Sequence, residues 1–445
     1  MKGFRRMGLQ NKNQGWRFLV LPAGLSFMAA GLAIILWNWT KIWGQDFGPI
    51  YLLAKALFRG YNIYAPNALR LWWPRYVGPS LSDMAYPDFY PPSTGAALFF
   101  VGLLPFRAAS LLFILVDYAV LVYGVWRLTV AFAPEWDARY RILAIGLTVC
   151  AGSVRWGFGL LQVAPLMLGL LAVFVGALTG SRPHIVEALI AGALILLVKP
   201  TFGLPILGLP ILQRRFKFLV VMLGIWALIN GLGFARLGGM AAAKDYISGV
   251  AGIYNKRGNS TNPYVIGSFF RIDWPALARG VGVRLKQVKV VCDALFILCI
   301  LGLFWEMRRS EGFALEPATT GAFLAPLVCL TLLGVYHHDY DAGFLLAPLI
   351  VYISSAKEYW KLSGVKLFTV LVIWYAGIYM PGKVPALLHA LGVGRNIIVY
   401  YEGMQGTIVI TLALIASFWA LHAYVSAKAR GKAPLAHARG SYARV

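Results

Sequence analysis

Apolar runs long enough to cross a lipid bilayer dominate the chain. Residues 17–37, 108–130 and 404–426 are examples with few or no charges, and they reach the roughly 17–25 residues that a transmembrane helix needs. Backbone polar groups in hydrocarbon must be satisfied within the segment, so such runs fold as helices. Hydrophobic residues make up 59% of the chain and charged residues 13%, against roughly 45–50% and about 25% in soluble domains. We therefore predict an all-α polytopic membrane protein.

The order of apolar runs and basic loops predicts about twelve spans with both termini inside. Lys and Arg in residues 1–16 place the N-terminus inside. Residues 93–104 are apolar, but at roughly 1.5 Å per residue they reach only about 18 Å, short of a hydrocarbon core of about 30 Å. If this segment is re-entrant, the basic loops at Arg141, Arg182 and Arg215 all fall inside, as expected. The predicted spans are 17–37, 108–130, 141–157, 160–178, 184–198, 200–213, 217–234, 287–306, 319–335, 340–355, 365–380 and 404–426.

This topology gives one membrane domain, residues 17–426, between a basic N-terminus (1–16) and a basic tail (427–445) that we expect to be disordered. Two long segments, 38–107 and 236–286, lie outside. The first holds aromatic-rich stretches near 47–58 and 66–76, which we predict to be interfacial helices. The first apolar run is long enough to remain as an anchor, so no cleaved signal is expected.

The net charge of +24 does not indicate a nucleic-acid partner. Most of it lies in short loops beside apolar runs, where it sets orientation and meets anionic lipid headgroups. The four cysteines lie inside apolar segments without zinc or disulfide spacing. We predict membrane lipids as partners, and neither a bound metal nor a cofactor.

Unusual polar residues gather on the predicted outer face. Asp46 is the first acidic residue of the chain and follows the first span directly. A carboxylate at that depth is costly unless it has a partner or a function. The other outer polar residues are Asp83, Tyr86, Asp88, Tyr90, Gln162, Lys199, His337, His338, Asp339, Tyr340, Asp341, Arg395 and Glu402. The asymmetry predicts a polar site at the outer interface and leaves its chemistry open.

Each of these residues also fits a purely structural role. Asp46 could cap an interfacial helix, and the prolines at 91 and 92 could simply stiffen a turn. Lys199 could extend its amine toward the interface. His337 and His338 are capable metal ligands, but adjacent side chains diverge and no His-x-x-x-His spacing occurs, so contacts to a phosphate or sugar are favoured.

Several motifs taken in order resemble glycosyltransferase family 87. They begin with Asp46-Phe47 and continue through Tyr51, Ala54, Gly60, Tyr64 and Phe89-x-Pro91-Pro92 with Tyr90 between. Gln162 follows, where the family often has Gly-Gln-x-Asn and this chain has Leu161 and Ala164 instead of Gly and Asn. The last matches are Lys199-Pro200 and His338-Asp339-Tyr340. The resemblance covers roughly residues 17–425.

The resemblance implies a C-type membrane fold with its active site on the non-cytoplasmic face of a bacterial cytoplasmic membrane. It implies inverting transfer of a hexose, mannose in the characterised members, from a polyprenyl-phosphate donor to a lipid or glycan acceptor. Asp46 would be the general base. The expected substrate-binding residues are Tyr51, Tyr86, Tyr90, Gln162, Lys199, His337, His338, Asp339 and Arg395.

Three other classes remain open. A transporter or lipid flippase would show internal repeats and charges deep in its spans. A C-type transferase of other chemistry would show a larger outer domain or different acids in the first loop. A structural subunit without activity would not need the family motifs to occur in their order along the chain. Polar groups gathered at one interface favour an enzyme.

Overall fold

A computed structural model describes residues 14–41, 47–78, 90–179, 183–256, 272, 274, 285–334, 337–378, 390–392 and 395–431. These residues form helices joined by short turns, and no strand occurs among them. The all-helical class predicted from the apolar runs is therefore confirmed. The N-terminal region and most of the tail lie outside the described residues, so the predicted domain limits stay predictions.

The described helices differ widely in length. The long helices are α2 (Gln14–Lys41), α6 (Phe106–Phe132), α12 (Phe216–Leu237), α15 (Leu285–Arg309), α16 (Pro317–Gly334) and α21 (Arg395–Ala429). Helices of intermediate length are α3 (Gly48–Arg59), α7 (Ala138–Cys150), α9 (Ala164–Thr179), α10 (Ile185–Val198), α11 (Gly203–Leu212), α13 (Met240–Lys256) and α19 (Ser363–Val372). The short pieces are α4 (Ala68–Tyr76), α5 (Pro92–Ala97), η1 (Phe99–Leu103), α8 (Gly152–Gly159), η2 (Pro200–Phe202), η4 (Glu311–Phe313), η5 (Asp339–Leu345), α17 (Leu346–Ser354), α18 (Ala356–Tyr359) and η6 (Ile373–Ile378).

Six of the described helices are long and apolar enough to cross a membrane: α2, α6, α12, α15, α16 and α21. A seventh span results if α7 and α8, which meet at 58°, are counted together. The other predicted spans coincide with shorter apolar helices such as α9 and α10. A polytopic helical membrane protein is thus established. Helix length alone does not establish twelve crossings, because a 14-residue helix rises only about 21 Å.

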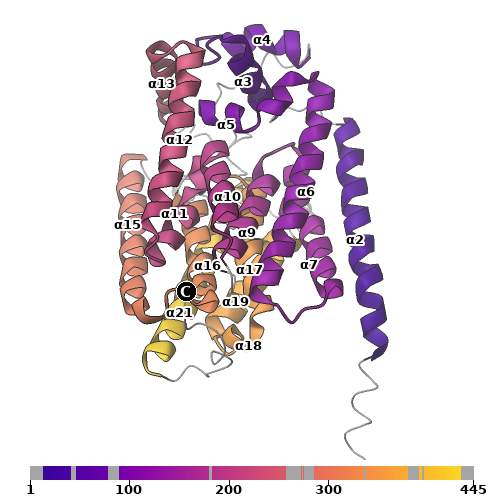
Figure 1. The fold of residues 1–445 in the computed structure, drawn as a ribbon, viewed down its shortest axis with the longest axis vertical. Helices are drawn as coiled ribbons and strands as arrows, with labels where there is room; N and C mark the ends of the chain where they lie inside the picture. Colours follow the sequence, from indigo (N-terminus) through magenta and orange to yellow (C-terminus); the bar gives the residue numbers. More distant parts are fainter. Residues whose placement is uncertain are drawn as a thin grey trace, which may run out of the picture.

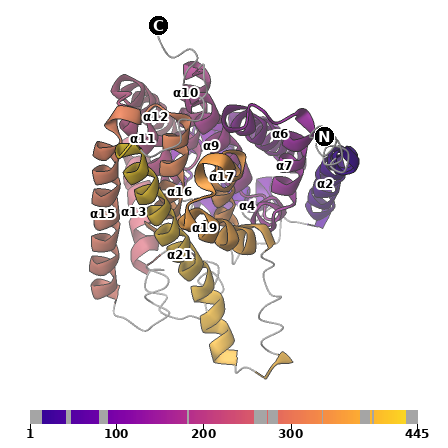
Figure 2. The same cartoon turned by 90° about the horizontal axis from the view of Figure 1, so that it is seen from below.

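The core of the bundle is built around α9, whose residues are all buried. Figure 2 shows α9 between α6 and α10, and α9 packs against both of them. At the α6–α9 crossing Gly124 faces the backbone of Gly169, where any Cβ would collide. Small residues allow this close approach between helices in membranes. The helix pair therefore forms a rigid support for the segments that join its ends.

A cap of short helices covers one end of the bundle. Figure 1 shows α3 and α4 at the top of the molecule, with α5 directly beneath them. The two stretches predicted as interfacial helices coincide with α3 and α4. The segment 93–104, predicted not to span, falls in α5 and η1, which pack against α3. Helices α2 and α15 flank the bundle on opposite sides (Figure 1).

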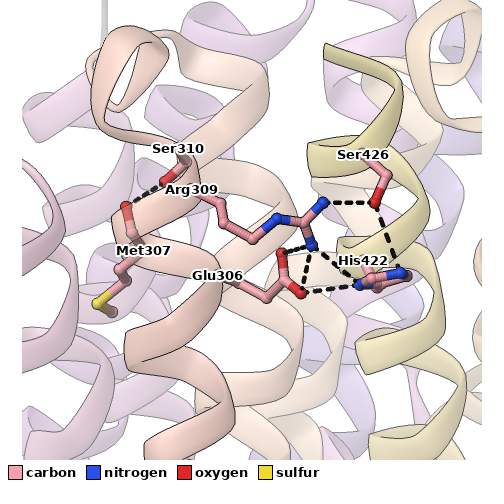
Figure 3. A network of polar contacts seen from close by, with 6 residues as sticks. All are labelled: Glu306, Met307, Arg309, Ser310, His422 and Ser426. Carbon is pink, nitrogen blue, oxygen red and sulfur yellow. Dashed lines mark hydrogen bonds and ion pairs between the residues drawn. The ribbon is translucent and has the colours of Figure 1, made fainter. Parts of the chain in front are cut away.

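The carboxyl-terminal ends of α15 and α21 are joined by a polar network (Figure 3). The Arg309 guanidinium lies 3.0 Å from both oxygens of Glu306 and donates to Ser426 Oγ at 2.8 Å. His422 Nδ1 lies 2.8 Å from Glu306 Oε1. Because Glu306 is buried, its charge needs these partners. The network fixes α15 to the bundle.

Candidate active site

The residues that follow the predicted base are held firmly, although Asp46 itself lies outside the described residues. The next residue, Phe47, is fully buried, and its ring stacks on Phe113 of α6 with 4.9 Å between centroids. Helix α3 then begins at Gly48, with Pro49 in its first turn, where the missing N–H costs nothing. The backbone directly after Asp46 is therefore anchored to α6. Tyr86 also lies outside the described residues, and of Arg395 only the backbone, at the start of α21, is described.

Tyr51 connects α3 to Leu104, the residue that follows η1. Its side chain is buried, and its hydroxyl donates to the Leu104 carbonyl at 2.9 Å. Burial and the neighbouring Tyr76 raise the pKa of Tyr51, so the hydroxyl remains a neutral donor. The structure thus gives Tyr51 a packing partner, and its predicted contact with substrate stays a prediction.

The segment Tyr90–Thr94 is tied to the end of α10. Ser93 Oγ donates to the Leu197 carbonyl at 2.8 Å, and Thr94 Oγ1 donates to the Val198 carbonyl at 2.9 Å. The last carbonyls of a helix lack partners within it, so these hydroxyls satisfy α10 just before Lys199. On its other side, Tyr90 accepts a hydrogen bond from Tyr64 through its carbonyl at 2.9 Å. Two of the predicted motifs, Tyr90 and Lys199, are therefore physically linked.

Lys199 is paired with a buried carboxylate. Its Nζ lies 3.1 Å from both carboxylate oxygens of Asp341, whose side chain is 1% exposed. His337, also buried, lies with Nδ1 at 2.9 Å from Asp341 Oδ2. The amine stands 4.8 Å from the centre of the Phe202 ring, at cation–π distance. A buried charge persists when it is paired and hydrogen-bonded in this way.

Asp341 also organises the turn η5. Its Oδ2 accepts the backbone N–H of His338 at 3.2 Å, which closes the first turn. Nearby, Asp339 accepts a hydrogen bond from the Tyr375 hydroxyl at 2.7 Å, and His338 stacks on Tyr340 with 5.3 Å between ring centroids. These contacts fix the predicted residues His337, His338 and Asp339 in one rigid turn.

The long segment 236–286 reaches this turn. The N–H of Ile272 donates to the His337 carbonyl at 3.1 Å. Trp274 is buried, and its indole N–H donates to Thr411 of α21 at 3.0 Å. Residues 272 and 274 therefore lie against the site, whereas most of residues 257–284 lie outside the described residues.

Gln162 lies in the turn between α8 and α9, and η5 packs against both of these helices. Its side chain is buried, and its N–H donates to the Gly157 carbonyl at 2.9 Å. The preceding Leu161 has φ +57°, in the left-handed region that favours glycine. This is the position at which the resemblance expects Gly. The backbone thus keeps a glycine-like conformation with a leucine in place.

The structure brings together Tyr90, Lys199 and the turn His337–Asp339, with Gln162 on a neighbouring turn. Sequence reasoning placed Asp341 in the outer turn without naming it as a substrate-binding residue, and it missed Phe202, Ser93, Thr94 and Tyr375. Asp341 was detectable in principle, because an acid next to an apolar run needs a partner. Among the described residues, no group of His, Cys, Asp and Glu is arranged to hold a metal ion.

The fold and this polar cluster define a polytopic membrane protein with a polar site at one end of its bundle. Comparison with protein families matches residues 89–334, more than half of the chain, to glycosyltransferase family 87. The chain belongs to this family and is therefore an enzyme that transfers a sugar. The matched region contains Tyr90, Gln162 and Lys199 but ends before His337 and begins after Asp46. No curated protein matches the chain, and no solved structure does.

Proposed function

We propose that this enzyme transfers a hexose, with mannose the first candidate, from a polyprenyl-phosphate carrier to a lipid-linked or glycan acceptor. The reaction would occur at the outer face of a bacterial cytoplasmic membrane, under the cap formed by α3 and α4. Membership in glycosyltransferase family 87 supports sugar transfer itself. The apolar helices support a donor carried by a lipid. The same proposal includes a C-type fold in which the shorter apolar helices complete about twelve crossings.

One observation carries the placement of the site: three separate motifs are joined by direct hydrogen bonds. Thr94 binds the carbonyl before Lys199, and Lys199 binds Asp341 in the turn that holds His338. The anchored Phe47 holds the fourth motif, Asp46-Phe47, on α6. Contact among three motifs that are distant in sequence favours one functional centre over three independent structural roles.

The proposed chemistry is a single displacement. An acceptor oxygen attacks the anomeric carbon of the donor while its proton passes to the carboxylate of Asp46. The bond from the anomeric carbon to the phosphate oxygen breaks, and its electron pair leaves with the polyprenyl phosphate. General-base assistance of this kind contributes about 10²–10⁴-fold in rate. Lipid phosphate leaves without a nucleotide, so the step needs no cofactor.

The leaving phosphate would be stabilised by groups at the start of η5 and at the start of α21. Because Asp341 already balances the charge of Lys199, the amine acts mainly by positioning the turn, and we assign direct phosphate contact to His338 and Arg395. Preorganised donors of this kind stabilise developing charge efficiently. We expect Lys199→Ala to weaken use of the donor more than use of the acceptor, because η5 would lose its anchor.

The test is a transfer assay with purified enzyme in nanodiscs. Polyprenyl-phosphate mannose, glucose and arabinose, each radiolabelled, are offered with a membrane lipid extract, with and without chelator. We expect label to move from one donor, and we expect chelator not to change the amount transferred. The Asp46→Asn variant should transfer no label while keeping the melting temperature of the wild type. Normal transfer by Asp46→Asn would show that Asp46 is not the general base. No movement from any donor would remove the proposed donor class.

A further inference from the structure

An apolar groove lies between α6 and α10. Both helices pack on α9, and the buried residues Leu170 and Val173 of α9 line the groove together with Val120 of α6 and Ile190 of α10. Its volume is about 560 Å³, within the roughly 300–1,000 Å³ of ligand pockets. Ile190 is 56% exposed, and α6 is long and apolar enough to span the membrane. The groove, which we call the α6–α10 groove, therefore opens toward lipid.

The length of the α6–α10 groove matches one leaflet of a bilayer. On α10 its lining runs from Ile185 to Leu194, and at about 1.5 Å per residue that stretch covers roughly 14 Å. The hydrocarbon core of a bilayer is about 30 Å thick, so one leaflet supplies about 15 Å. Beyond Leu194, α10 continues to its end before Lys199, where Ser93 of the segment beneath the cap binds it. The groove therefore lies in the leaflet opposite the cap.

A polar bridge closes the end of the groove that is far from the cap. Glu187 Oε1 accepts hydrogen bonds from the Tyr123 hydroxyl at 2.6 Å and from Arg127 Nε at 2.8 Å. Its Oε2 accepts a third from Arg127 Nη2 at 2.7 Å. A guanidinium has five N–H donors, and the bridge leaves Nη1 of Arg127 without a partner among the described residues. The Arg127 side chain is 16% exposed, so these remaining donors are available to a ligand.

An apolar groove with a guanidinium at its end fits a lipid that carries a phosphate. One acyl chain of a single leaflet matches the length of the groove, and guanidinium donors match the geometry of a phosphate. The lipid phosphate of the proposed reaction belongs at the other end of α10. From Glu187 to Lys199 that helix rises roughly 18 Å, so one phosphate cannot occupy both positions. The groove therefore suits a second lipid that is not a substrate.

We propose that the α6–α10 groove binds one phospholipid of the leaflet opposite the cap, with an acyl chain along α9 and the phosphate at Arg127. Both walls of the groove support the candidate site, because α10 ends before Lys199 and α6 holds Phe47 through Phe113. A lipid that contacts both helices stabilises this support. Since such a ligand binds the folded protein and not the unfolded chain, it raises the melting temperature.

The first experiment counts lipids bound to the full-length protein. Enzyme stripped of lipid in detergent is titrated with dioleoylphosphatidylglycerol, and native mass spectrometry resolves each bound molecule. We expect one molecule to bind at least about tenfold more tightly than the rest, because hydrogen bonds to a charged group contribute about that factor or more. Ile190→Trp fills the groove and should abolish this tight binding. The matched control is Val220→Trp on α12, an exposed position outside the groove, which should retain it.

A second titration tests the contact with the phosphate. Dioleoylglycerol has the same chains without a phosphate and should bind at least about tenfold more weakly than the phospholipid. Arg127→Lys keeps a positive charge beside Glu187 but removes the spare guanidinium donors, so it should reduce the preference for the phospholipid. An unchanged preference in Arg127→Lys, or equal binding of the two lipids by the wild type, would overturn the proposal.

Melting curves of the same proteins give an independent measurement. Added phosphatidylglycerol should raise the melting temperature of the wild type and of Val220→Trp, and it should not raise that of Ile190→Trp. Equal shifts in all three proteins would overturn the proposal, because lipid would then act outside the groove. Tight binding of polyprenyl phosphate without tight binding of phosphatidylglycerol would assign the groove to the donor and overturn the proposal as well. No step of this test requires sugar transfer, so a failure of the proposed reaction leaves it decisive.

Discussion

Two positively charged regions lie at the same end of the bundle and differ in how their charge is balanced. Lys199 is largely buried, with both oxygens of Asp341 at 3.1 Å. Lys55 and Arg75 lie on the cap over aromatic rings and have no carboxylate partner among the described residues. A neutralised pair contributes rigidity, whereas unbalanced cations leave charge for a ligand. Positive residues at the same end of the bundle can therefore have different roles, one structural and the other in binding.

Removing Asp341 from its pair with Lys199 should have the largest effect. Asp341→Ala leaves Lys199 without its partner and removes the acceptor that closes the first turn of η5. Breaking one side of a buried pair costs about 3–5 kcal/mol, so we expect a marked fall in melting temperature and loss of transfer. Thermal unfolding in detergent measures the first effect.

A double variant sharpens this expectation. Lys199→Met with Asp341→Leu removes both charges and should recover much of the lost stability, since apolar replacement of a buried pair is often neutral or stabilising. If Asp341→Ala alone melted like the wild type, the pair would be unimportant for the fold. The contrast with the cap would then disappear.

The sequence predicts the fold class well and the balance of charge poorly. Apolar runs such as 108–130 indicate α6 directly, because spanning length and composition are local properties. The count of spans is harder, because helices such as α7 and α8 break within an apolar run. The Lys199–Asp341 pair joins residues 142 positions apart. No periodicity in the chain encodes such a contact, so the sequence predicted Lys199 as a substrate-binding residue without its acidic partner.

A contact between α3 and α4 tests whether the cap must be rigid. Gly48→Ala places a Cβ within the Trp73 indole, and overpacking of this kind costs about 1–3 kcal/mol. We expect α4 to shift, with a lower melting temperature and slower transfer, because Gly48 lies two residues from the proposed base Asp46. The matched control is Gly224→Ala in α12, where nothing lies within 4 Å of the added Cβ. An unchanged rate of transfer in Gly48→Ala would show that the packing of α4 on Gly48 does not affect the reaction.

Ionic strength should distinguish the two regions without any mutation. Raising salt from 50 to 500 mM shortens the screening length from about 14 Å to about 4 Å. Binding of inorganic phosphate to the cap should weaken severalfold, because Arg75 is exposed. The loss of stability caused by Asp341→Ala should barely change, because buried pairs are screened little. Phosphate titrations and melting curves at both salt concentrations test this, and salt-independent phosphate binding would contradict an electrostatic role for the cap.

The smallest effect on stability is expected at Leu161, in the turn between α8 and α9. Its φ of +57° is strained for leucine, so Leu161→Gly should gain about 1–2 kcal/mol in backbone energy. The side chain is only 2% exposed, and losing it should cost about 2–3 kcal/mol. The two terms nearly cancel, and we expect a melting temperature close to that of the wild type with transfer retained. Leu161→Ala keeps the strain and loses most of the packing, so it should be less stable than Leu161→Gly. The reverse order in thermal unfolding would show that the turn before Gln162 does not need a glycine-like backbone.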